Sequence, residues 1–274
     1  MPLAQLNAIE RYYQEAGSGD PLLLINGLTG TCLGWEPLVP ALAEHFRVIT
    51  SDNRGVGRSS APPGPYTTRQ MADDAAALLA HLGVARAHVV GSSMGGMIAR
   101  ELALAYPSLV DHMVLYATSA RPRRAIFDPW LNFVVQTTER LDSTLVTMGW
   151  LPWLYTPAFF EQPEQVEAVL GWHEPYPSPA HGIAAQAEAV RYHDTPERLS
   201  QITAPTLVLV GAEDVVTPVY YSHELVDRIP GAQLHVLERG GHEALWQYPE
   251  VGMEALLGFL APGVSEGILD QQAP

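Results

Sequence analysis

The sequence contains no lysine and only one cysteine, Cys32. All of its basic residues are therefore arginines, and the 15 of them face 30 acidic residues, which gives a formal net charge of −15. A chain this acidic repels nucleic-acid phosphates, and the short run Arg121-Pro122-Arg123-Arg124 is too small to form an opposing basic surface. A single cysteine excludes an internal disulfide and a cysteine-rich metal site. We expect no nucleic-acid partner.

Long apolar runs are also missing. No run reaches the ~18 residues that a membrane-spanning helix needs. The stretch Met1–Glu10 lacks the basic and apolar regions of a secretory signal. We therefore expect no membrane partner and, by default, a cytoplasmic location. The 274 residues, 47% of them hydrophobic, suffice for one large domain with a sizeable core.

Short apolar runs alternate with helix-like stretches over most of the chain, which is typical of a parallel sheet flanked by helices. The strands expected from these runs are Tyr12–Glu15 (as an edge strand), Pro21–Ile25, Phe46–Ser51, His88–Gly91, Val110–Tyr116, Thr206–Gly211 and Ala232–Leu237. The expected helices include Trp35–Glu44, Thr68–Leu82, Met97–Tyr106 and Met253–Leu260. The predicted fold class is α/β, with a mostly parallel sheet.

The middle of the chain breaks this rhythm. Residues 120–201 contain no clear strand but many aromatic side chains, which predicts a helical insertion between two strands. Such an insertion can cover a site as a cap with an apolar underside, to which we expect Trp130 and Trp153 to contribute. The predicted division is a core of residues 1–119 and 202–262, a cap of residues 120–201 and a C-terminal tail of residues 263–274.

A nucleophile is predicted where one strand meets a helix. The segment Gly91-Ser92-Ser93-Met94-Gly95 fits the pattern G-x-S-x-G. Its glycines allow a sharp turn that exposes the hydroxyl of Ser93. Ser92 occupies a variable position of the pattern, so we interpret it as structural.

A serine hydroxyl needs a base, and the base needs a carboxylate to orient it. Among ten histidines, His242 stands out because it lies in a glycine turn just after a strand, whereas the others lie in helices or strands, at strand starts or in the insertion. Asp214 follows another strand, with Glu213 as its main competitor. Loops after parallel strands gather at one edge of the sheet, so Ser93, Asp214 and His242 are predicted to converge as a catalytic triad.

An attacked carbonyl becomes an oxyanion that needs hydrogen-bond donors. The backbone N–H of Met94, at the head of a helix, is one candidate. The glycine-rich loop Asn26–Gly30 offers a second through the N–H of Leu28. We expect neither a metal nor an organic cofactor in this chemistry.

With these motifs in place, the chain resembles the α/β-hydrolase superfamily over residues 10–260, and within it the capped carboxylesterases, 3-oxoadipate enol-lactone hydrolases and carbon–carbon-bond hydrolases. The motifs that carry the resemblance are Asn26–Gly30, Asp52–Ser59, Gly91–Gly95, Gly211–Asp214 and Gly240–His242. The loop that usually begins His-Gly begins here with Asn26. Trp246, four residues after His242, is similar to a tryptophan of the carbon–carbon-bond hydrolases and is a candidate both for the substrate pocket and for packing.

The resemblance implies a serine hydrolase that cleaves the ester or lactone of a small organic substrate through an acyl-enzyme. Two alternatives use the same residues. One is a hydrolase that breaks a carbon–carbon bond in a vinylogous diketone, and the other is a receptor-like protein that binds a ligand with little turnover. The motifs leave the acyl and alcohol specificity, the stereoselectivity and the oligomeric state open.

Overall fold

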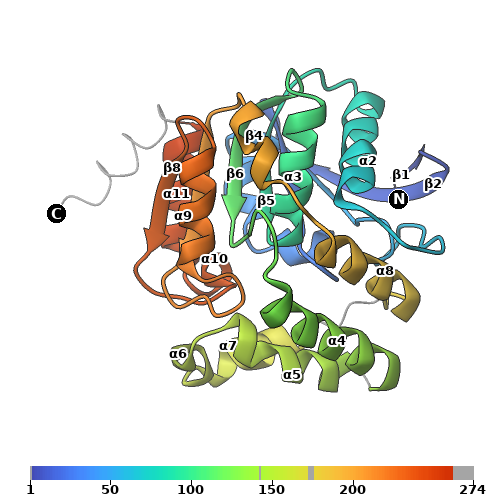
Figure 1. The fold of residues 1–274 in the computed structure, drawn as a ribbon, viewed down its shortest axis with the longest axis vertical. Coiled ribbons are helices and arrows are strands. Elements are labelled where there is room, and N and C mark those ends of the chain that lie inside the picture. The colour runs from blue at the N-terminus through green and yellow to red at the C-terminus, as the bar shows by residue number, and fades with distance from the viewer. Residues whose placement is uncertain (1, 142, 172–175, 262–274) are drawn as a thin grey trace.

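The computed structural model describes residues 2–141, 143–171 and 176–261, so the predicted C-terminal tail of residues 263–274 lies outside the described residues. Eight strands form one sheet in the order β1-β2-β4-β3-β5-β6-β7-β8. β1 and β2 run antiparallel to their neighbours, and the strands from β4 to β8 pair in parallel. Helices flank this sheet (Figure 1), which confirms the predicted α/β class.

The strands are β1 (Leu3–Leu6), β2 (Ile9–Ala16), β3 (Asp20–Ile25), β4 (Phe46–Ser51), β5 (Ala87–Ser92), β6 (Val110–Tyr116), β7 (Thr206–Gly211) and β8 (Gln233–Leu237). The helices are η1 (Cys32–Trp35), α1 (Val39–Ala43), α2 (Thr68–His81), α3 (Met94–Ala105), α4 (Arg124–Arg140), α5 (Ser143–Leu154), α6 (Pro157–Phe160), α7 (Pro163–Gly171), α8 (Ala180–Arg191), η2 (Pro196–Gln201), α9 (Val219–Arg228), α10 (Ala244–Gln247) and α11 (Pro249–Leu260).

Two of the predicted elements are wrong in detail. Tyr12–Glu15 is not an edge strand, because β2 pairs with β4 on one side and with the short strand β1 on the other. The helix predicted over Trp35–Glu44 is divided into η1 and α1. Pro37 lies between the two pieces and Pro40 is at the start of α1, and proline cannot donate the backbone hydrogen bond that a continuous helix interior requires.

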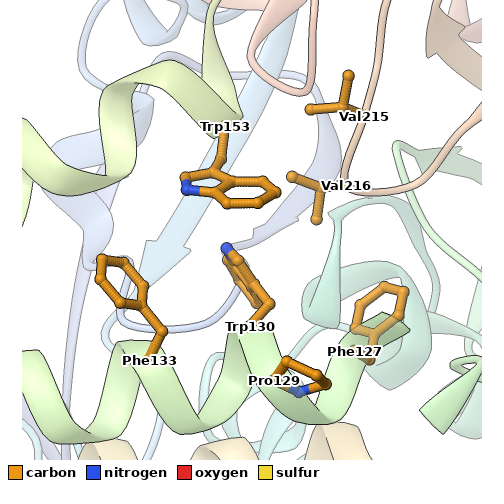
Figure 2. Close-up of a pocket in the computed structure, with 7 residues that line it drawn as sticks. All are labelled: Phe127, Pro129, Trp130, Phe133, Trp153, Val215 and Val216. Carbon is orange, nitrogen blue, oxygen red and sulfur yellow. The ribbon is translucent and has the colours of Figure 1, made fainter. Parts of the chain in front are cut away.

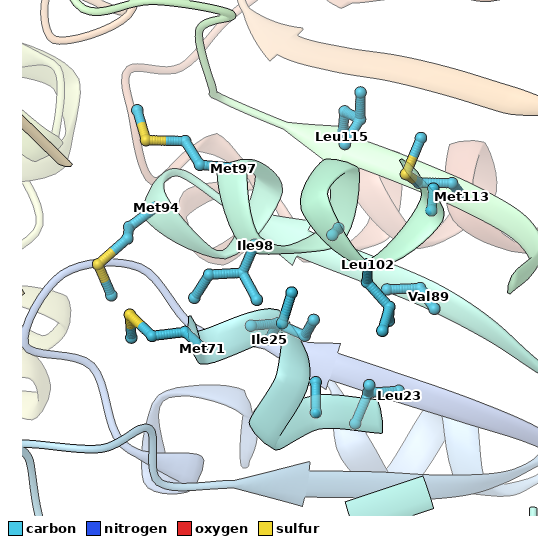
Figure 3. Packing of buried hydrophobic residues seen from close by; sticks show 14 of the residues in the cluster. Leu23, Ile25, Met71, Val89, Met94, Met97, Ile98, Leu102, Met113 and Leu115 are labelled. Atoms are coloured by element: carbon cyan, nitrogen blue, oxygen red, sulfur yellow. The ribbon is translucent and has the colours of Figure 1, made fainter. Parts of the chain in front are cut away.

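The core lies on both faces of the sheet, because successive side chains of a strand point to opposite faces. In β3, Leu23 and Ile25 belong to one buried cluster, whereas Leu22 and Leu24 belong to another. Figure 3 shows the first cluster, in which side chains of α2 and α3 pack against the strands. The second cluster includes side chains of η1, α1 and α11.

Between β6 and β7 the regular elements of the described residues are all helices, from α4 to η2. Figure 1 shows α4, α5, α6 and α7 as a separate layer below the sheet. Helix α8 packs against α4. This helical character agrees with the predicted insertion, while the residue boundaries of core and cap stay a prediction. None of the described helices is long and apolar enough to span a membrane.

Candidate active site

Ser93 lies on a strained turn between β5 and α3. Its backbone has a φ of 53° and a ψ of −116°, a conformation that residues other than glycine rarely adopt. A Cβ atom at Gly95 would collide with the backbone carbonyl of Ile25, so glycine is required at that position. The N–H of Ser93 donates to the carbonyl of Tyr116 at 2.9 Å, which anchors the turn to β6. The strain is therefore maintained by the surrounding sheet.

Asp214 and His242 form a buried hydrogen-bonded pair. The His242 Nδ1 atom lies 2.9 Å from Asp214 Oδ2, and both side chains are almost inaccessible to solvent. The Asp214 carboxylate also accepts hydrogen bonds from the backbone N–H groups of Val216 and Thr217 and from the Thr217 hydroxyl, at 2.7 to 2.8 Å. Glu213, the competitor in sequence, is exposed and instead accepts from the N–H of Gly240 at 3.3 Å. The geometry thus favours Asp214 as the orienting acid.

The pair stabilises its own charges. Burial by itself lowers the pKa of His242, but the charge and hydrogen bond of Asp214, together with the charge of Glu243, outweigh it and raise this pKa above its usual value. Burial by itself raises the pKa of Asp214, yet His242 and the hydrogen bonds of Thr217 bring it below its usual value. His242 can therefore accept a proton while Asp214 remains ionised.

The sequence does not predict two hydroxyl groups that support this pair. Thr217 contacts both members of the pair, since its Oγ1 atom lies 2.7 Å from Asp214 Oδ2 and 3.3 Å from His242 Nδ1. The Tyr116 hydroxyl donates to the carbonyl of His242 at 2.6 Å and accepts from the N–H of Leu245. Neither residue belongs to a recognisable motif, because each acts through a contact that only the folded chain creates.

Ser93 and His242 line a common cavity of about 210 Å³ between the sheet and the helices of the β6–β7 connection. Residues 26–30 form part of its wall. A Cβ atom at Gly27 would lie 3.1 Å from Ser93 Cβ, so this loop passes directly beside the candidate nucleophile. Leu28 is one of the lining residues. Met94 is the first residue of α3, and the first N–H groups of a helix have no acceptor within it.

Asn26, which stands where the resembling families usually carry histidine, has a structural role in this loop. Its side-chain amide donates to the carbonyl of Thr31, and its own carbonyl accepts from the Asn53 side chain at 3.1 Å. The N–H of Thr29 donates to Gln186 Oε1 of α8 at 3.0 Å. These contacts close the loop and link it to the overlying helices without a histidine.

The three tryptophans predicted to line the pocket occupy different places. Trp246 lines the cavity of Ser93, but it also donates from Nε1 to the carbonyl of Gly34 at 2.6 Å and packs against the ring of Trp35. Trp130 lines this cavity and also a second, largely apolar cavity of about 310 Å³. Trp153 lines only the second cavity.

Figure 2 shows that second cavity, with Trp130 between the ring of Trp153 and helix α4. Its lining residues come from α4, α5 and the loop after Asp214, and they are Phe127, Pro129, Trp130, Phe133, Trp153, Val215 and Val216. The buried Nε1 atom of Trp130 makes no hydrogen bond with any described residue. Trp130 is common to the linings of the apolar cavity and of the cavity of the candidate nucleophile, and we call it the partition between them.

Glu243 was not singled out by the sequence, although it follows His242 directly and lines the same cavity. Burial, reinforced by the negative charge of Asp214, raises the pKa of Glu243 to about 7 against the opposing charge of His242. Its backbone N–H donates to the carbonyl of Leu154 at 2.9 Å, which joins the histidine turn to the end of α5. A second titratable carboxyl group thus lies within the candidate site.

The chain also matches known proteins over most of its length. A family model described as the alpha/beta hydrolase fold matches residues 20–249. The chain is 33% identical over 272 residues to a protein of Azorhizobium caulinodans provisionally named the carbamate hydrolase RutD, covering 94% of this chain and 98% of that protein.

Two solved structures are similar over nearly the whole chain. An enol-lactonase from Burkholderia xenovorans LB400 has a TM-score of 0.85 and 27% identity, covering 94% of this chain and 99% of that one. A thermophilic esterase from Thermogutta terrifontis has a TM-score of 0.84 and 30% identity, covering 94% and 97%. The overall fold is thus the one that these two enzymes have.

Proposed function

Because the chain belongs to the α/β-hydrolase family, we propose that this hydrolase uses Ser93, His242 and Asp214 to cleave a carboxylic ester or lactone of a small organic molecule. The observation that carries the proposal is the buried His242–Asp214 pair, with 2.9 Å between Nδ1 and Oδ2, whose histidine lines the same cavity as Ser93. The alternative acid is exposed, and the serine lies on a strained turn that presents its hydroxyl.

The reaction proceeds in two stages. His242 Nε2 removes the proton of Ser93 Oγ as this oxygen attacks the substrate carbonyl carbon. The N–H groups of Leu28 and Met94 stabilise the resulting oxyanion, and Asp214 stabilises the protonated imidazole. The carbon–oxygen bond to the alcohol then breaks, and the alcohol leaves with the proton from His242. Water, activated by the same imidazole, attacks the acyl-enzyme and regenerates Ser93.

Ester or lactone cleavage suits the lining of the site. Apolar side chains of the cavity itself, such as Val134, Leu151 and Leu154, offer room for a hydrocarbon group, while the polar groups of the site are concentrated around Ser93 and His242. Similar solved structures include an enol-lactonase and an esterase. The name of the carbamate-hydrolase relative adds a related substrate, since a carbamate also presents a carbonyl carbon to the nucleophile.

The test is hydrolysis of p-nitrophenyl esters from acetate to dodecanoate by the wild type, Ser93→Ala and Ser92→Ala. We expect Ser93→Ala to lose at least about 10³-fold in kcat, because removing the nucleophile leaves only the contributions of binding and oxyanion stabilisation. Ser92→Ala is the matched control, one residue earlier in the same turn, and is expected to retain most of the activity. Simple lactones and carbamates are assayed next.

Equal turnover by Ser93→Ala and the wild type would contradict the proposed mechanism. A folded wild type that is inactive on every ester, lactone and carbamate would instead favour the two alternatives. Loss of colour from a yellow ring-fission product would then identify a carbon–carbon-bond hydrolase. Thermal stabilisation by a ligand that is never consumed would identify a receptor-like protein.

A further inference from the structure

A second group of chemically capable side chains lies at the other end of the sheet. His88 is near the start of β5, and Asp111 and His112 are near the start of β6. Ser93 follows the carboxyl end of β5, so the length of that strand separates the two places. The sequence placed these histidines only at strand starts and assigned them no role.

A β-bulge brings the three side chains together. Ala87 pairs with Val110 and Val89 pairs with Met113, so the register shifts between these two pairs. One residue of β5, His88, therefore faces two residues of β6, Asp111 and His112. Bulges redirect side chains that would otherwise alternate between the two faces of a sheet, and this one places consecutive residues of β6 near the same imidazole.

The ligand atoms of this group have the spacing of a metal site. Asp111 Oδ2 lies 3.4 Å from His88 Nδ1 and 3.5 Å from His112 Nδ1, and the ligand atoms all lie within 4.8 Å of one another. Zinc binds imidazole nitrogen and carboxylate oxygen at about 2.0–2.2 Å, which puts neighbouring ligands of a tetrahedral site roughly 3.3–3.5 Å apart. The two distances from Asp111 match that spacing.

The Nδ1 atoms of His88 and His112 also lack hydrogen-bond partners among the described residues. Both atoms are buried. The His88 residue as a whole is only 6% exposed. A buried polar atom without a hydrogen bond costs folding free energy, so two such nitrogen atoms close to one carboxylate oxygen need an explanation.

The surroundings hold the three side chains in place. Phe46 packs edge-on against the His88 ring, with ring centroids 5.7 Å apart, and Phe259 does the same to His112 at 5.5 Å. Arg86 forms an ion pair with Asp111 Oδ1 at 2.5 Å, which leaves Oδ2 on the side of the imidazoles. Contacts of this kind orient the ligands of metal sites.

We propose that His88 Nδ1, His112 Nδ1 and Asp111 Oδ2 bind a divalent transition-metal ion of the Zn²⁺ type, with water completing the coordination. Two imidazoles and one carboxylate suit zinc, cobalt or nickel, whereas magnesium and calcium prefer oxygen ligands alone. The ion links the starts of β5 and β6 and lies apart from the proposed hydrolytic site. It stabilises the fold and takes no part in ester cleavage.

The test is calorimetric titration of the metal-free full-length protein with ZnCl₂, together with Co²⁺ titration followed by visible absorption. We expect one ion per chain, a Co²⁺ spectrum that Zn²⁺ abolishes, and a rise of at least about 3 °C in Tm at saturating Zn²⁺. His112→Ala and Asp111→Asn weaken binding at least about tenfold. Both residues are only partly buried, so these variants are expected to fold, which circular dichroism verifies.

His223→Ala is the matched control, because it removes an exposed histidine of α9 and should leave the Zn²⁺ affinity unchanged. The absence of stoichiometric binding in the wild type would overturn the proposal. Equal affinity in the wild type, His112→Ala and Asp111→Asn would overturn it as well, since the ion would then lie elsewhere. Because every readout is binding or stability, the result stands whether or not the protein hydrolyses esters.

Discussion

The loops at the carboxyl edge of the sheet contribute polar groups to the candidate site, whereas the helices between β6 and β7 contribute apolar ones. The loops supply buried polar groups fixed by hydrogen bonds, such as the four that Asp214 accepts. The helices supply apolar side chains, including Val134 of α4 and Leu151 and Leu154 of α5, which line the cavity of Ser93. The difference suggests that the loops determine the rate of the chemistry and the helices determine which substrate is accepted.

Asp214→Asn, in the loop after β7, tests whether the loops determine the rate, and it has the largest expected effect. We expect kcat to fall by about 10³ to 10⁴-fold with little change in KM, because the amide favours the wrong tautomer of His242 and cannot stabilise its charged form. Steady-state kinetics on the best p-nitrophenyl ester measure the loss. Glu213→Gln, one residue earlier, is the control and should remain near wild-type activity. If Glu213→Gln lost as much as Asp214→Asn, the acid would have been misassigned.

The polar residues that follow the parallel strands, such as Asp214 and His242, could be predicted from the sequence for a simple reason. Parallel strands buried on both faces are nearly continuous apolar runs, so Val110–Tyr116 and Thr206–Gly211 were predicted with the bounds that the structure has. Once the strands are located, chemistry-bearing residues just after them must meet at one edge. The buried Asp214–His242 pair is what that rule leads one to expect.

Other features depend on packing that no local pattern encodes. The strand β1 was missed because it has only four residues, two of them exposed, and exists through its pairing with β2. Whether a tryptophan of the insertion faces Ser93 depends on how α4 and α5 pack, which is why Trp130 lines both cavities and Trp153 only one. The bulge opposite His88 likewise appears only when β5 and β6 are paired.

Replacing the partition tests the apolar half of the comparison. We expect Trp130→Ala to join the cavities of about 310 and 210 Å³, so that longer acyl chains can be buried. Each buried methylene contributes roughly 0.8 kcal/mol. The ratio of kcat/KM for the octanoate ester to that for the acetate ester should therefore rise by at least about tenfold.

The control for this change is Trp153→Ala, which alters only the apolar cavity and leaves the partition in place. It should change the ratio by less than about threefold, which corresponds to less than the contribution of one methylene. A Trp130→Ala variant with an unchanged ratio, together with a wild-type Tm, would mean that the apolar cavity does not receive the acyl group.

The smallest expected effect is that of replacing Glu243, which connects the loops with the helices. Glu243 belongs to the histidine turn, and its backbone N–H donates to the carbonyl of Leu154 at the end of α5. Its charge helps to raise the pKa of His242, and its own pKa lies at about 7. His242 acts as a base only when neutral, so the rate falls as pH drops through its raised pKa. Glu243→Gln removes the charge and lowers the pKa of His242. The acidic limb of kcat/KM should move to lower pH by a few tenths of a unit.

Glu213→Gln, whose exposed carboxylate is better screened, should leave the limb in place. A limb that stayed fixed in Glu243→Gln would show that Glu243 keeps its proton throughout the working range. A shift toward higher pH would contradict the proposed coupling. Because the charges of Glu243 and His242 are coupled, the limb of the wild type belongs to the pair and that of the variant to His242 alone, so the variant should also show the simpler, single-proton curve.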